Sequence, residues 1–176
     1  MRRKRAERLL QATALRGWPV CRSAFRIGNV TGLEYDHARG RVTRVKLKAV
    51  GASRAVSVPW RVVSFRRAEC RELLLSDWPH VEALSVQGRP VETLTVRGES
   101  DESTTLFVHD VLFRTGEGNI VSYEVGLLPK GASSLPALSV PAERFRVRGE
   151  QLYLPDALLR DLKRAAAAQL GWFPPA

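Results

Sequence analysis

Three histidines, His37, His80 and His109, are the side chains in this sequence best suited to acid–base chemistry. Imidazole is the side chain whose unperturbed pKa lies between about pH 5 and 8. His37 falls in a predicted hairpin turn and His80 lies between two repeated segments, so we interpret both as solvated. The pair His109-Asp110 is of a type that binds metals. A metal site needs further ligands nearby, and the surrounding predicted strand supplies none.

Two cysteines, Cys21 and Cys70, offer the other reactive side chains. We predict that both fill small spaces in a core, because free cysteine is among the most buried residue types. Their number and spacing exclude a disulfide framework and a zinc-binding CxxC motif. The glycine-containing segments 97–100 and 116–118 lack the Lys-Ser/Thr ending of a phosphate-binding loop. We therefore expect no enzyme activity, no catalytic residue, no metal and no cofactor.

The most pointed functional signal is a row of cations in the basic first half of the chain. The 176 residues carry 28 Lys and Arg against 18 Asp and Glu, and the excess lies in residues 1–75. Within a predicted strand over 42–48, Arg44, Lys46 and Lys48 alternate with uncharged residues. Alternation places these cations, here called the cation row, on one outer strand face about 6.6 Å apart.

Two classes of partner suit an exposed cation row, and the alternative is a solvated face without a binding role. An acidic protein surface is our first choice, and the backbone of RNA is our second. For RNA, Trp60 or Trp18 would supply a stacking surface. The predicted binding residues are Arg44, Lys46, Lys48, Arg61 and Trp60. Charges on an outer strand also protect a sheet from aggregation, so the row can equally be a solvated face.

An internal repeat organises the chain into two copies of a unit of about 80 residues. Segment 10–20 matches 81–91 at an offset of 71, 40–47 matches 118–125 at 78, Val58-Pro59 matches Val140-Pro141 at 82, and 73–75 matches 152–154 at 79. Changes of offset between these matches are typical of loop insertions in a duplicated fold.

Each copy is rich in short β-type segments separated by Gly-containing turns, which favours a small antiparallel barrel. From about Asp156 to Leu170, apolar residues at helical spacing predict a helix. The expected fold is therefore mainly β, with two small antiparallel β-barrels and a C-terminal α-helix. We expect a first domain at 1–77 with a basic N-terminal tail, a second at 78–155, and the helix and tail at 156–176.

The order of these pieces resembles the PRC-barrel family. The resemblance rests on a Leu-x-Gly-x-Pro-Val turn at Leu15–Val20, a similar turn at Val86–Val91, a Gly-led strand pair, and a Val-Pro run near the end of each copy. It covers about 65 residues in each copy. Trp60 and a shortened third hairpin depart from the pattern in the first copy, and two longer loops depart from it in the second. The resemblance implies a non-enzymatic adaptor that binds protein or RNA.

Location and assembly follow from what the sequence lacks and from its predicted helix. The longest apolar runs are far shorter than the about 20 residues of a membrane span, so we expect no integral membrane segment. No apolar stretch follows the basic start, and we expect a cytoplasmic protein. The apolar stripe of the C-terminal helix should dock on a barrel or on a second copy, which allows a homo-oligomer.

Overall fold

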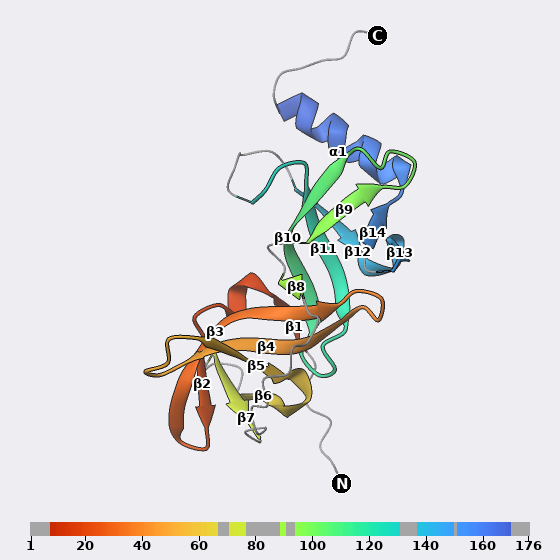
Figure 1. Ribbon diagram of the computed structural model, residues 1–176. Coiled ribbons are helices and arrows are strands. Elements are labelled where there is room, and N and C mark those ends of the chain that lie inside the picture. The colour runs from red at the N-terminus through yellow and green to blue at the C-terminus, as the bar shows by residue number, and fades with distance from the viewer. Residues whose placement is uncertain are drawn as a thin grey trace, which may run out of the picture.

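Two β-sheets and one C-terminal helix make up the computed structural model, which describes residues 8–66, 71–76, 89–90, 94–130, 137–149 and 151–169. Each sheet contains seven strands. The first sheet is built mainly from the first half of the chain and the second mainly from the second half, and helix α1 (Asp156–Gln169) lies against the second (Figure 1). The prediction of a mainly β fold with one C-terminal helix is confirmed.

Equivalent strands follow one another in the same order in both sheets. The first sheet runs β5-β4-β3-β2-β7-β6, and the second runs β12-β11-β10-β9-β14-β13. The first set is β2 (Pro19–Arg22), β3 (Phe25–Asp36), β4 (Arg41–Ala49), β5 (Ala55–Pro59), β6 (Val63–Arg66) and β7 (Glu72–Leu75). The second set is β9 (Thr95–Gly98), β10 (Thr105–Arg114), β11 (Ile120–Gly126), β12 (Ala137–Pro141), β13 (Arg146–Arg148) and β14 (Gln151–Leu154). We call β2 to β7 the first unit and β9 to β14 with α1 the second unit.

The central hairpin of each unit contains two β-bulges at matching positions. In the first unit, Thr31 of β3 and Thr43 of β4 are the extra residues. In the second unit they are His109 of β10 and Val121 of β11, each 78 positions later. A bulge bends a strand and redirects its side chains, so two shared bulges indicate a shared backbone design. These matches support the duplication and the predicted equivalence of β4 and β11.

One short strand from each half of the chain pairs with the sheet that is built mainly from the other half. Strand β1 (Leu9–Gln11) pairs with β10, where Leu10 lies opposite Phe113. Strand β8 (Arg89–Pro90) pairs with β3, where Arg89 lies opposite Tyr35. Leu10 and Arg89 therefore occupy equivalent places. The sequence match at an offset of 71 is wrong here, because it aligns Pro19 of β2 with Pro90 of β8, whereas the counterpart of β2 is β9 and the counterpart of β8 is β1.

The hairpin tips of the two units also meet directly. The amide of Val42 donates to the carbonyl of Gly118 at 2.8 Å, and the amide of Ile120 donates to the carbonyl of Gly40 at 2.8 Å. Gly118 has a φ of +76°, and a Cβ atom there would lie 2.9 Å from the Val42 carbonyl oxygen. A residue with a side chain is excluded at this position by both conformation and space. The reciprocal contacts give the two units an approximate two-fold relation.

A Val-Pro step ends the fourth strand of each unit and turns the chain away from the sheet. Pro59 leads into the 3-10 helix η2 (Trp60–Val62), and Pro141 leads into η4 (Ala142–Arg144). Each short helix carries the chain to the opposite end of its sheet, where β6 or β13 begins. Among the described strands, β5 does not pair with β6 and β12 does not pair with β13. The expectation of two small antiparallel barrels is therefore met only by two curved sheets with matching strand order. Each sheet is also mixed, because β2 pairs with β7 and β9 pairs with β14 in parallel.

Helix α1 packs its apolar side onto the second unit. Leu159, Leu162 and Ala166 are buried, and Leu159 approaches Gly98 so closely that a Cβ atom at Gly98 would lie 2.7 Å from its Cδ2. The prediction that this helix docks on a barrel-like sheet agrees with these contacts. The predicted domain boundary at 77/78 and the final predicted helical residue, Leu170, lie outside the described residues.

Candidate binding surface

The cation row lies on the outer face of β4, but its members are not equally exposed. Val45 and Leu47 are fully buried on the opposite face, as alternation predicts. Lys48 is exposed, Lys46 is half-buried, and Arg44 is only 9% exposed. The expectation of three exposed cations is therefore wrong for Arg44. The bulge at Thr43 also places this residue outside the simple alternation that assigned it to the inner face.

Arg44 and Lys46 converge on a buried carboxylate, Glu34, from the neighbouring strand. The Nε atom of Arg44 lies 3.8 Å from Oε2 of Glu34, and Nζ of Lys46 lies 3.7 Å from Oε1. Ser57 on β5 donates its hydroxyl to Oε1 of Glu34 at 2.6 Å. Arg44 also donates from Nη2 to the Ser57 carbonyl at 2.9 Å. Two of the three cations therefore neutralise an internal charge, and these four residues are called the Glu34 cluster.

Trp60 and Arg61 are adjacent in η2 and lie in different environments. Trp60 is 6% exposed, and its ring meets Phe113 of the second unit edge to face with centroids 5.3 Å apart. Phe65 packs on the same ring at 5.8 Å. Trp60 is thus a core residue between the units and offers no open stacking surface. Arg61 is exposed.

A shallow basic groove of about 450 Å³ lies where the hairpin tips of the two units meet. Arg39, Arg41 and Arg61 line it together with Asp36 and Glu117. Asp36 lies 3.6 Å from Nε of Arg39, and Glu117 lies 3.6 Å from Nη2 of Arg41. These exposed ion pairs are weak in water, so the guanidinium groups stay accessible to a partner. We call Arg39, Arg41 and Arg61 the groove arginines.

Exposed charge differs sharply between the two units. Between Pro19 and Ser76, eight described Lys and Arg side chains are exposed, and none of the described acidic side chains is. The exposed cations are Arg22, Arg26, Arg39, Arg41, Lys48, Arg54, Arg61 and Arg71. The second unit mixes both signs, with Glu102, Glu117, Glu143 and Asp161 exposed among its cations. All the exposed charged side chains described in the first unit are thus positive, while Asp36 and Glu72 are half-buried.

No protein-family model matches this sequence, and no curated protein matches it. The groove and the charge distribution therefore carry the functional argument by themselves. No helix in the described part of the chain is long and apolar enough to cross a membrane.

Two of the three histidines have structural partners. His37 is 8% exposed, its Nδ1 lies 3.2 Å from the hydroxyl of Tyr123, and its ring stacks on Tyr35. The interpretation of His37 as a solvated turn residue is wrong, because the turn carries the ring into the boundary between the units. His109 is the extra residue of its bulge, and its Nε2 lies 2.7 Å from the carbonyl of Leu128. His80 lies outside the described residues.

The remaining candidates for chemistry add no reactive centre within the described residues. Cys21 is a buried thiol, in agreement with the prediction of a core residue. Cys70 lies outside the described residues. No group of three His, Cys, Asp or Glu side chains that could hold a metal occurs in the part of the chain that the structure describes.

A second cavity, of about 310 Å³, lies between η1 (Thr13–Leu15), β3 and β10 and was not foreseen from the sequence. Tyr35 lines it, and its buried hydroxyl has no hydrogen-bond partner among the described residues. Burial, reinforced by the Asp110 carboxylate, raises the pKa of Tyr35 well above its usual value. Asp110 accepts hydrogen bonds from the Thr13 amide at 3.1 Å and from the Thr13 hydroxyl. Long-range pairing of β1 with β10 creates this space, and no local sequence pattern signals such pairing.

Proposed function

We propose that this protein is a non-enzymatic adaptor that docks an acidic protein partner through the positive surface of its first unit. This proposal rests on one observation: among the described residues between Pro19 and Ser76, eight cations are exposed and no acidic side chain is exposed. Such a surface attracts an acidic partner over a distance of about a Debye length and repels basic surfaces. We propose the groove arginines as the docking site, because they line a hollow that a partner side chain can enter.

At the groove arginines, the environment of the tryptophans favours a protein partner over RNA. Binding of single-stranded RNA commonly combines a cationic track with exposed aromatic rings on which bases stack. Trp60 is packed between the units, and Trp18 is half-buried against Phe65. The positive surface alone would still hold an RNA backbone, so RNA binding in ribosome or RNA maturation is the second outcome that the experiment must distinguish.

We also propose that each unit is a PRC-barrel-like domain. The Gly-led hairpin and the Val-Pro step that turns the chain recur in both units and support this assignment. The Leu-x-Gly-x-Pro-Val turn contributes less, because Pro19 and Pro90 lie in the non-equivalent strands β2 and β8. An adaptor role agrees with the binding function that the family resemblance implies.

Co-purification of tagged full-length protein from its native host, with and without nuclease, tests the proposed function. We expect an acidic protein that survives nuclease and is lost when Arg39, Arg41 and Arg61 are replaced by Ser. Replacing Arg97, Arg144 and Arg164 of the second unit by Ser removes the same charge from exposed positions and should leave that protein bound. Loss of the bound material on nuclease treatment would instead establish RNA as the partner. Equal retention of the protein by both triple variants would refute docking through the first unit.

A further inference from the structure

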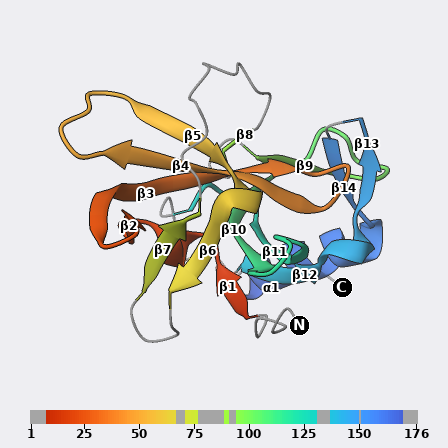
Figure 2. The same ribbon diagram turned by 90° about the horizontal axis from the view of Figure 1, so that it is seen from below.

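Two neighbouring turns at one end of the first unit carry its most exposed apolar side chains. Phe25, at the start of β3, is 77% exposed, and Val50, just after β4, is 72% exposed. The turns lie side by side, since the Val50 amide donates to the carbonyl of Ile27 at 2.9 Å and Gly28 pairs with Ala49. In both ribbon views these turns lie at the end of the first unit away from the second (Figures 1 and 2).

The charged residues of these turns and of the adjoining strand ends are all cations. Segments 19–30 and 45–58 contain no acidic residue. Four of their cations are exposed: Arg22, Arg26, Lys48 and Arg54. We call Phe25, Val50 and these four cations the tip patch. Exposed aromatic and aliphatic side chains cost solvation free energy, so a protruding pair with a positive rim indicates a contact surface.

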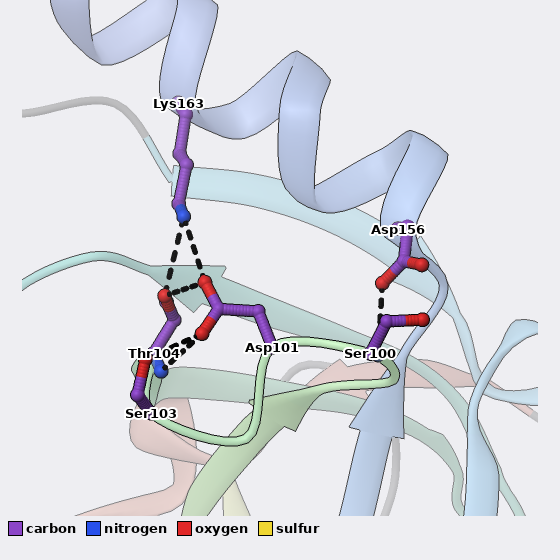
Figure 3. Close-up of polar contacts among 6 residues, drawn as sticks. All are labelled: Ser100, Asp101, Ser103, Thr104, Asp156 and Lys163. Atoms are coloured by element: carbon purple, nitrogen blue, oxygen red, sulfur yellow. Dashed lines mark hydrogen bonds and ion pairs between the residues drawn. The ribbon is translucent and has the colours of Figure 1, made fainter.

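The equivalent turn of the second unit has the opposite character. The segment between β9 and β10 carries Glu99, Asp101 and Glu102. Helix α1 covers this turn: Asp156 accepts a hydrogen bond from the Ser100 amide at 3.0 Å, and Lys163 lies 3.1 Å from Asp101 (Figure 3). In the second unit, helix α1 of the same chain thus provides polar partners for the turn at this end of the sheet.

We propose that the tip patch docks on an anionic lipid bilayer, with Phe25 and Val50 entering the headgroup layer. An interfacial site needs apolar side chains that protrude and cations that remain at the level of the lipid phosphates. Both features occur together on the tip patch. A protein partner would need a matching hollow, whereas a bilayer receives a protruding pair without one.

This inference goes beyond the proposed function because it concerns the other end of the same hairpin. Phe25 begins β3 and Asp36 ends it, and a strand of 12 residues spans about 40 Å. The groove arginines lie near the Asp36 end. The tip patch can thus rest on a membrane while the groove holds a protein, which would make the adaptor a membrane tether.

Sedimentation with vesicles of equal parts phosphatidylcholine and phosphatidylserine tests this proposal. We expect the full chain to bind these vesicles and to bind vesicles of phosphatidylcholine alone much more weakly. The double variant F25S/V50S should lose about tenfold in partitioning, because two inserted apolar side chains are removed. R22S and R26S should each lose roughly fivefold, and raised salt should weaken binding of the parent.

Matched variants separate this proposal from the first. Leu128 and Val147 are exposed apolar residues of the second unit, and L128S/V147S should bind vesicles like the parent. R39S/R41S/R61S should lose the protein partner and keep most of the vesicle binding. Failure of the parent to sediment with anionic vesicles, or equal sedimentation of F25S/V50S and the parent, overturns the proposal. Loss of a co-purified protein from F25S/V50S, without vesicle binding by the parent, would assign the tip patch to a protein partner.

Discussion

The outer faces of β4 and β11 occupy equivalent places in the two units, yet one is filled by charge and the other is hollow. By their strand registers, the positions of Glu34, Arg44 and Lys46 in the first unit are equivalent to those of Leu112, Ser122 and Glu124 in the second. The first face holds the Glu34 cluster. The second has a groove of about 260 Å³ lined by Ser122 and Glu124, with Asp110 and Ser139.

This difference shows that a charged outer strand can be part of the fold. In the second unit the position of Glu34 is taken by Leu112, and the position of Arg44 is taken by Ser122. The buried carboxylate and its arginine are thus both present in one unit and both replaced in the other, as expected when either charge alone would be costly. The exposed cations that we propose for binding lie at the two ends of the β3–β4 hairpin.

The largest expected effect follows from Trp60, whose counterpart in the second unit is the small residue Ala142. Trp60→Ala should lower the free energy of unfolding by about 3 to 5 kcal/mol, because it empties a space between the units against Phe113. Urea unfolding followed by circular dichroism measures this change. Trp60→Phe, which keeps much of the apolar volume, serves as the control. A loss smaller than about 1 kcal/mol would show that the ring is dispensable for packing.

Exchange of the Glu34 cluster for its counterpart tests the equivalence of the two faces. Glu34→Gln should cost about 3 kcal/mol in unfolding free energy, since the nearly buried Arg44 guanidinium loses its counter-charge. The double variant Glu34→Leu, Arg44→Ser installs the residues of the second unit and should recover most of that stability. Urea midpoints of the single and double variants give the comparison. Equal loss in both variants would mean that the two faces are not interchangeable.

Much of this architecture could be predicted from the sequence because it depends on local pattern. Alternation identified the buried side chains Val45 and Leu47, and helical spacing identified Leu159 and Leu162 of α1. The offset of 78 predicted the equivalence of β4 and β11.

Features that depend on contacts between distant segments could not be predicted in this way. The sequence shows that Arg44 is charged, but only the pairing of β3 with β4 shows that Glu34 lies opposite it. Trp60 was interpreted as a stacking surface because its partner, Phe113, belongs to the other unit. The tip patch was missed because Phe25 and Val50 become neighbours only when two turns lie side by side.

A smaller effect is expected from the polar contact between Tyr123 and His37, which has no counterpart elsewhere in the pair of units. Tyr123 takes the place of Val45, and its hydroxyl lies 3.2 Å from Nδ1 of His37. Tyr123→Phe removes one buried hydrogen bond and should reduce the unfolding free energy by about 1 kcal/mol. Urea unfolding measures the change, and Tyr153→Phe, in a half-buried position, is the control. An unchanged midpoint for Tyr123→Phe would show that this contact does not join the units.

The smallest effect concerns the acidic turn of the second unit and its dependence on pH. Hydrogen bonds from Ser103, Thr104 and Lys163 hold the pKa of Asp101 well below its usual value. The folded state therefore gains stability from this carboxylate above the unfolded pKa of about 3.9 and loses it as pH falls further. Asp101→Asn should lower the melting temperature at pH 7 by a small amount, and the difference from the parent should shrink between about pH 4 and pH 2. A difference that stays constant over this range would contradict a role for the charge.

Strands β1 and β8 each pair with a sheet built mainly from the other half of the chain, and this pairing constrains the order of folding. Strand β1 is near the beginning of the chain, but its partner β10 is made only after the whole first unit has been synthesised. Contacts between residues so distant in sequence slow folding, because a long loop must close before they form. The first sheet likewise acquires β8 only once the chain has passed its own last strand. The first sheet therefore cannot reach its final width during synthesis of its own half, and the second depends on a strand from the beginning of the chain, so each half needs the other to complete its sheet.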